Sequence, residues 1–191
     1  ATVVRSGCMA KDADMILSEF ILLGIGGKEL SEENAAQTAK ALNIIQPDFI
    51  RVHATGIKLE SKLGEFVRDG SFTLQSEEEI VIEQKLFLQQ LHEMDSYYVN
   101  EHIVNLLLEV RGNLRTEKQE MLSTIDRFLT LPPDERLLFT VGRRLNIFFR
   151  LDYLKKPKLH QKAGESLQQI LSKNPHVDFA ALCNYVRQSQ I

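Results

Sequence analysis

Short apolar runs alternate with amphipathic stretches over the first half of the chain. Residues 16–23, ILSEFILL, are mostly apolar and stop at Gly24, which predicts a parallel strand buried on both faces. Ser31, followed by two glutamates, predicts the N-cap of a helix that runs to about Ile45. Residues 49–54, FIRVHA, are rich in β-forming residues and predict a second strand. This order predicts a βαβ unit with a right-handed crossover.

Helical patterns dominate from residue 76 onward. Ser76 and Glu79 have the spacing of a capping box, and apolar residues follow at helical intervals as far as Met94. Residues 96–99, SYYV, are a candidate third strand. Further helices are expected at residues 116–129, 133–149, 160–172 and 178–188. The predicted fold class is α/β and helix-dominated, with one βαβ unit, a first region at 1–110 and a helical region at 111–191.

The predicted sheet is small for the helices around it. Two or three strands are fewer than the roughly four to six of a common sheet. A parallel pair also needs cover on both faces and partners at its edges. Either the helices wrap the sheet completely, or strands from another chain or from a missing N-terminal part complete it. The sequence slightly favours the second interpretation.

Composition and charge limit the class of protein. The 191 residues are 43% hydrophobic and 26% charged, which is enough apolar material for a packed core. A net charge of −3 argues against a dedicated nucleic-acid binder, and we interpret the basic stretch at 150–162 as a solvated helical face. No apolar run approaches the roughly 18 residues of a membrane span. Because the first residues also lack the layout of a secretory signal, we expect a cytoplasmic protein.

A glycine-rich turn follows the first predicted strand. Gly24, Gly26 and Gly27 allow the backbone to approach a ligand closely, and amides near a helix N-terminus favour anionic or polar groups. Glu29 stands where the third glycine of a dinucleotide-binding fingerprint would be, and no P-loop lysine follows. A ligand-binding turn and a plain tight turn are both consistent with this pattern.

The carboxyl ends of the predicted strands carry polar residues. His53 and Thr55 end the second strand, and His102 follows the candidate third strand. In parallel α/β folds ligands bind at these ends, so three neighbouring strands would bring the residues to one mouth. There the histidines could donate hydrogen bonds or carry protons, and the alternative is that they are partly exposed loop residues.

Metal and thiol chemistry find little support. His102 and Asn105 are expected on one face of a helical stretch beside Glu101, but a third ligand at metal-binding spacing is not visible, and no metal site is expected. Cys8 and Cys183 cannot form a disulfide framework, and neither has a histidine at a telling distance. Cys183 stands on an apolar helix face and is predicted to be a core residue.

One long stretch resembles a known enzyme family. Residues 17–52 are similar to the C-terminal part of the barrel in a group of bacterial radical S-adenosylmethionine (SAM) proteins, in which a strand ends in Gly-x-Gly-Gly and a later one begins with Pro-Asp-Phe-Ile-Arg. The likeness continues, in order, through blocks at 64–72, 76–91, 100–114 and 121–145.

The resemblance implies a fragment of a partial (β/α) barrel that holds SAM at its strand ends. By this resemblance the cofactor-binding residues are Gly24, Gly26, Gly27, Arg51 and His53. The residues of the substrate cavity are Thr55, His102 and Asn105.

The chain lacks the cysteine signature of that family. The three closely spaced cysteines that ligate a [4Fe–4S] cluster are absent, so no cluster is expected here and the chain alone should not be catalytic. We therefore expect its partner to be a missing N-terminal barrel half or a second copy. The alternative is a non-catalytic helical interaction module, in which the helices after residue 76 and the unmatched tail at 147–191 bind a protein partner.

Overall fold

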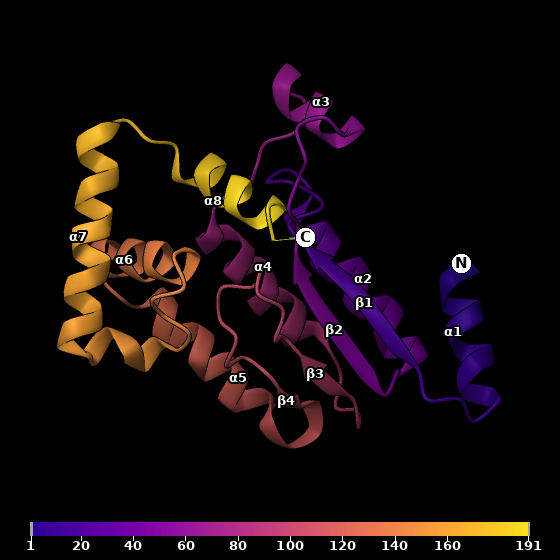
Figure 1. Cartoon of the computed structure of the whole chain (residues 1–191). Coiled ribbons are helices and arrows are strands. Elements are labelled where there is room, and N and C mark those ends of the chain that lie inside the picture. Colours follow the sequence, from indigo (N-terminus) through magenta and orange to yellow (C-terminus); the bar gives the residue numbers. More distant parts are fainter. Residues whose placement is uncertain (1, 191) are drawn as a thin grey trace.

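The computed structural model describes residues 2–190 and shows a small sheet with helices on one side and a helical region beyond it (Figure 1). Strands and helices alternate at first, and only helices follow the last strand. The elements are α1 (Thr2–Asp12), β1 (Ser18–Leu23), α2 (Ser31–Ile45), β2 (Phe49–Ala54), α3 (Lys62–Asp69), α4 (Glu77–Gln90), β3 (Tyr97–Val99), β4 (Gly112–Asn113), α5 (Leu114–Leu129), α6 (Pro133–Arg144), the 3₁₀ helix η1 (Leu151–Lys155), α7 (Pro157–Lys173) and α8 (Phe179–Gln188).

The sheet has four strands in the order β1-β2-β3-β4. β1, β2 and β3 are parallel, and the two-residue β4 pairs antiparallel with β3. In the register Ser18 lies opposite Phe49, and Phe49 lies opposite Tyr97. The predicted βαβ unit and the candidate third strand are therefore confirmed, in a helix-rich α/β fold.

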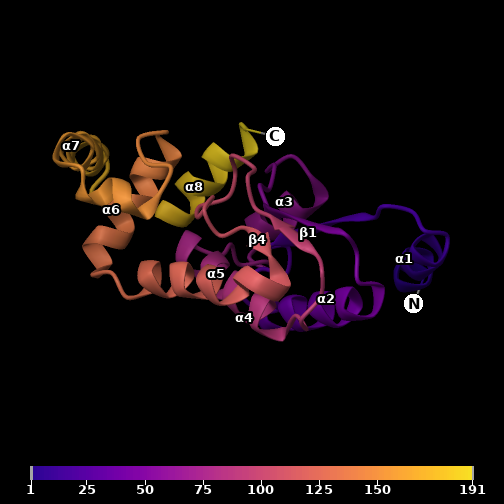
Figure 2. The same cartoon turned by 90° about the horizontal axis from the view of Figure 1, so that it is seen from below.

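The helices cover one face of this sheet. Figure 2 shows α2 and α4 on one side of the strands, where Ile21, Ile50 and Val52 are buried. On the opposite face Phe20 and Leu22 are 63% and 46% exposed. The prediction that the first strand is buried on both faces is therefore wrong, because no helix packs over this part of the second face within the described residues.

Two helix starts differ from the sequence prediction. Ser31 is the first residue of α2 and not its N-cap, because its hydroxyl donates a hydrogen bond to the Glu83 carboxylate at 3.0 Å. α5 begins at Leu114, two residues before the expected start, since the Asn113 side chain accepts hydrogen bonds from the first backbone amides of the helix. The capping box of Ser76 is confirmed.

Aromatic rings of the helical region belong to the same hydrophobic core as the buried face of the sheet. The rings of Phe139 and Phe148 stack with centroids 5.8 Å apart. α6 ends at Arg144 rather than at residue 149, because the chain turns back through Asn146, whose φ is 58°, and places Phe148 against Gly142. Within residues 2–190, no helix is long and apolar enough to cross a membrane.

A buried ion cluster ties this region to the sheet. Glu77 at the start of α4 binds Arg144 of α6 at 2.6 Å and also pairs with Arg187 of α8, and all three side chains are almost fully buried. Arg187 donates to the backbone oxygen of Thr55, directly after β2, and Arg144 donates to that of Val104. Burial alone would raise the pKa of Glu77, but the two guanidinium groups outweigh it and hold the pKa below its usual value.

We predict that Glu77→Gln destabilises the protein by about 3–5 kcal/mol, because it leaves two buried arginines without their counter-charge. The depressed pKa of Glu77 means that its contribution is present above the unfolded-state pKa and is lost as the pH falls through the lower folded-state value. Urea unfolding at neutral and acidic pH measures both effects.

The neighbouring residue offers a matched control. Glu78 pairs with Arg136 at 2.9 Å, but its side chain is 42% exposed. Glu78→Gln should change stability by no more than about 1 kcal/mol. Equal losses in the two variants would contradict the role assigned to the buried cluster.

Candidate functional site

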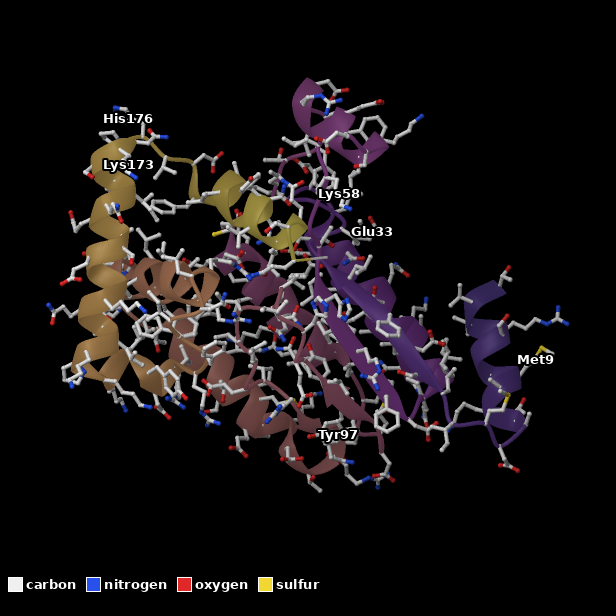
Figure 3. All side chains as sticks on the ribbon, viewed as in Figure 1. Met9, Glu33, Lys58, Tyr97, Lys173 and His176 are labelled. Atoms are coloured by element: carbon white, nitrogen blue, oxygen red, sulfur yellow. The ribbon has the colours of Figure 1, made fainter. Side chains whose placement is uncertain are left out.

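The uncovered face of the sheet carries a group of polar and aromatic side chains, which we call the open face. Strand alternation places Arg51 and His53 on this face, with Phe20 and Leu22 as their neighbours on β1. Figure 3 shows side chains standing over these strands, with Tyr97 at the end of the sheet where β3 begins. Figure 1 looks onto the same face.

Arg51 lies between two aromatic rings on the open face. Its guanidinium carbon is 6.0 Å from the centre of the Phe20 ring and 5.9 Å from that of Phe49, a cation–π arrangement on two sides. Its Nε donates a hydrogen bond to the Ser18 hydroxyl at 3.0 Å. In the part of the chain that the structure describes, no carboxylate pairs with Arg51, and its two terminal nitrogens have no hydrogen-bond partner.

The two histidines of the predicted mouth meet. The rings of His53 and His102 stack with centroids 4.2 Å apart, and the Phe20 ring meets His53 edge-on at 5.4 Å. Burial lowers the pKa of His53, and the positive charges of His102 and Arg51 lower it further. Parallel pairing thus brings His53 and His102 together at the carboxyl end of the sheet. Arg51 lies on the same face, and its guanidinium reaches toward Ser18 and Phe49 at the amino ends of β1 and β2.

Asn105 closes the end of β2 from the buried side. Its Oδ1 accepts the backbone amide of Ala54, and its Nδ2 donates to the backbone oxygen of Val52 and to the Asn100 side chain, each at 2.7 Å. These bonds use the amide group fully, so Asn105 positions the strand end. The expected helical stretch around His102 and Asn105 is wrong: residues 101–110 form a loop, because these tertiary hydrogen bonds replace helical ones.

The glycine-rich turn is folded onto its own protein. The Gly24 amide donates to the Glu83 carboxylate at 3.2 Å, and the Gly27 amide donates to the Gly24 oxygen at 3.3 Å. Gly24 and Gly27 have φ of 83° and 62°, a region that favours glycine. The amides of Gly24 and Gly27 are thus already engaged, and the close approach at Gly26 is made by the protein's own Leu30, whose amide donates to the Gly26 oxygen.

Glu83 is the residue that sequence reasoning missed. It is fully buried on α4 and accepts hydrogen bonds from Gly24, Ser31 and Asn34. The available signal was its position three residues after Ile80 and four before Phe87, on the apolar side of the helix. A carboxylate at such a position predicts a buried acceptor that organises a neighbouring turn.

Two further candidates lie in different places, Thr55 at the mouth and Cys183 in the helical region. Thr55 follows β2, and its Oγ1 is buried without a hydrogen-bond partner among the described residues. Cys183 is buried on α8 as predicted, and burial raises the pKa of its thiol to about 12, which leaves it unreactive at neutral pH. Within residues 2–190 no three His, Cys, Asp or Glu side chains are arranged to hold a metal ion.

Comparison of the chain with protein-family models, with curated proteins and with solved structures gives no match in any of the three. The geometry of the open face and the sequence motifs are therefore the basis for assigning a function to this chain.

We predict that Asn105→Ala destabilises the protein by about 2–4 kcal/mol, because it leaves the buried Ala54 amide and the Val52 oxygen unpaired. Asn43→Ala is the matched control: Asn43 also makes two backbone hydrogen bonds, to Gln90 and His92, but near solvent, and should lose about 1 kcal/mol or less. Urea unfolding followed by circular dichroism compares the two. Similar losses would show that Asn105 has no special positioning role.

Proposed function

We propose that this chain is the C-terminal part of a radical SAM-type barrel enzyme, that it forms part of the wall of the SAM and substrate cavity, and that it is not catalytic alone. The observation that carries the proposal is the one-sided sheet: three parallel strands with helices on one face and polar and aromatic residues on the other. In a (β/α) barrel the helices lie outside, and the opposite face of the strands lines the interior.

The order of the helices supports a curved wall. α1 contacts α2 and α2 contacts α4, in the same sequence as β1, β2 and β3, the strands that come after these helices in the chain. Such an arrangement is expected of successive βα units of a barrel. The open face would then be the interior surface, with His53 and His102 at its mouth and Arg51 deeper along β2.

The polar groups at the mouth fit a ligand such as SAM. The buried Thr55 hydroxyl lacks a hydrogen-bond partner among the described residues. When bound, SAM would supply the radical precursor, and in this proposal residues 24–27 and 53–55 contact it. The [4Fe–4S] cluster does not fit, since Cys8 and Cys183 are the only cysteines and Cys183 is buried in the helical region.

The proposal implies a partner that completes the sheet. β1 ends the strand order and has a strand neighbour on one side only among residues 2–190. A cluster-bearing barrel half or a second copy would add strands there and cover Phe20 and Leu22. We place the chain in the cytoplasm, in keeping with its two free cysteines.

We predict that SAM added to the ¹⁵N-labelled chain shifts the amide resonances of residues 24–27 and 53–55 and leaves those of α7 unchanged. Gly26→Ala should weaken this response, since a Cβ there would lie 2.9 Å from the Leu30 oxygen. Gly164→Ala, whose Cβ would meet open space, is the matched control. Shifts absent from the strand ends, or confined to α6–α8, would contradict the proposal.

We also predict that the chain self-associates through the open face and the β1 edge. Light scattering should show a mass that rises with concentration, and the double variant Phe20→Ser, Leu22→Ser should reduce it, because both side chains lose apolar surface. Ile44→Ser, on α2 and 55% exposed, should have no effect. A monomer at all concentrations would count against the incomplete-barrel interpretation.

A second candidate function is the non-catalytic interaction module. It is favoured by an apolar cavity of about 380 Å³ between α6, α7 and α8, whose apolar lining includes Val141, Leu145, Ile170 and Val186. A protein partner could bury an apolar side chain there. A silent SAM titration together with loss of a partner on introducing Ile170→Lys would favour this function over the first.

A further inference from the structure

We infer that Arg51, His53 and His102 form a recognition site for the anionic group of a small molecule, a carboxylate or a phosphate carried on a flat apolar body. The inference deepens the proposed function, in which this molecule would be the substrate rather than SAM. It depends on the arrangement of these three side chains on the open face.

Arg51 brings to the cluster a positive charge that has no carboxylate partner among the described residues. His53 stacks on His102 and feels the positive charge of Arg51, and no carboxylate is among the groups that influence it. Glu101, the nearest acid along the chain to His102, is already paired with Arg111. Within the described residues Arg51 has no carboxylate partner either. An anion at this position would give Arg51 a counter-charge and would favour protonation of the neighbouring His53 ring.

The free donors lie along one strip of the sheet. Arg51 and His53 are two residues apart on β2 and therefore stand on the same face, roughly 6.5 Å apart along the strand. Nε of Arg51 is held by Ser18, which orients the fork of its terminal nitrogens for a bidentate contact with a carboxylate or phosphate. His102 Nδ1 accepts the Val104 amide at 3.4 Å, so its Nε2 carries the proton and can donate.

The surroundings select a flat ligand body. The Phe20 ring is 63% exposed and lies beside both Arg51 and His53. Leu22 and Tyr97 extend the apolar surface on either side, and each is more than a third exposed. A planar ring attached to the anionic group could therefore stack on Phe20 while the anion contacts Arg51.

The test uses benzoate and phenyl phosphate as anionic probes and benzamide as the neutral analogue. Histidine ring resonances are followed by NMR through a pH titration of the whole chain. Both anions should raise the pKa of His53, because a negative charge within about 4–6 Å favours the protonated ring. The resonances of His53 and His102 should move on binding, and those of His92, His160 and His176 should not.

Variants separate charge recognition from a general surface effect. Arg51→Gln should weaken benzoate binding about tenfold or more, and should raise the pKa of His53 in the free protein because a positive neighbour is removed. Arg51→Lys should fall between the wild type and Arg51→Gln, because it keeps the charge but loses the fork. Arg127→Gln removes an exposed arginine of α5 that pairs with Asp152 of η1. This variant should bind benzoate as the wild type does.

Three results would overturn the inference. They are unchanged benzoate binding in Arg51→Gln, benzamide binding as tight as benzoate, and no movement of the His53 resonance up to about 100 mM of either anion, well above the millimolar affinity of a weak charged contact. Benzoate binding without any SAM response would leave this site standing and remove the enzyme proposal. A SAM response without anion binding would do the reverse.

Discussion

Burial of the Glu77 carboxylate between two arginines holds together three parts of the chain that are far apart in sequence. Charged groups removed from water are tolerated only when each finds its counter-charge and its hydrogen bonds. Here the pairing fixes α4, α6 and α8 against one another. Through Arg187 and Arg144 it also anchors the backbone at Thr55 and Val104, on the two loops that flank the stacked histidines. The geometry of the mouth thus depends on an interaction in the helical region.

The buried polar groups beneath the sheet complete this framework. Glu83 organises the glycine-rich turn, and Asn105 binds the end of β2. Each saturates backbone groups that would otherwise be unpaired away from water. The strand ends are therefore rigid, while the open face above them keeps free donors. Binding sites commonly combine such a fixed base with unpaired groups directed to the ligand.

The sequence predicted the elements better than their surroundings. The run from Ile16 to Leu23 and the β-rich stretch at 49–54 identified the parallel pair, because strand propensity and the intervening helix are local signals. The run could not distinguish burial on both faces from an uncovered face, since Phe20 and Leu22 look the same whether a partner covers them or not. Asn105 was predicted in a helical stretch, because its bonds to Val52 and Ala54 are tertiary and leave no local pattern.

At the strand ends, the sequence predicted one feature of the candidate site and missed another. Convergence of His53 and His102 followed from the parallel order of strands, which local patterns indicated. The use of the Gly24 amide by Glu83 did not, because it depends on how α4 packs under the turn. Contacts between elements that are about sixty residues apart become visible only when the elements are placed in space.

The two edge strands of the sheet differ in a way that limits how copies of the chain can pair. β4 consists of two residues and continues directly into α5, so it offers almost no ladder to a further strand. Among residues 2–190, only β1 leaves a full-length strand edge without a strand neighbour. A molecule with one unpaired strand edge can pair with one other molecule about a two-fold axis. The resulting dimer then has no unpaired strand edge for a third molecule. Assembly by strand addition would stop at two, and fibre growth would be prevented by the shape of the sheet itself.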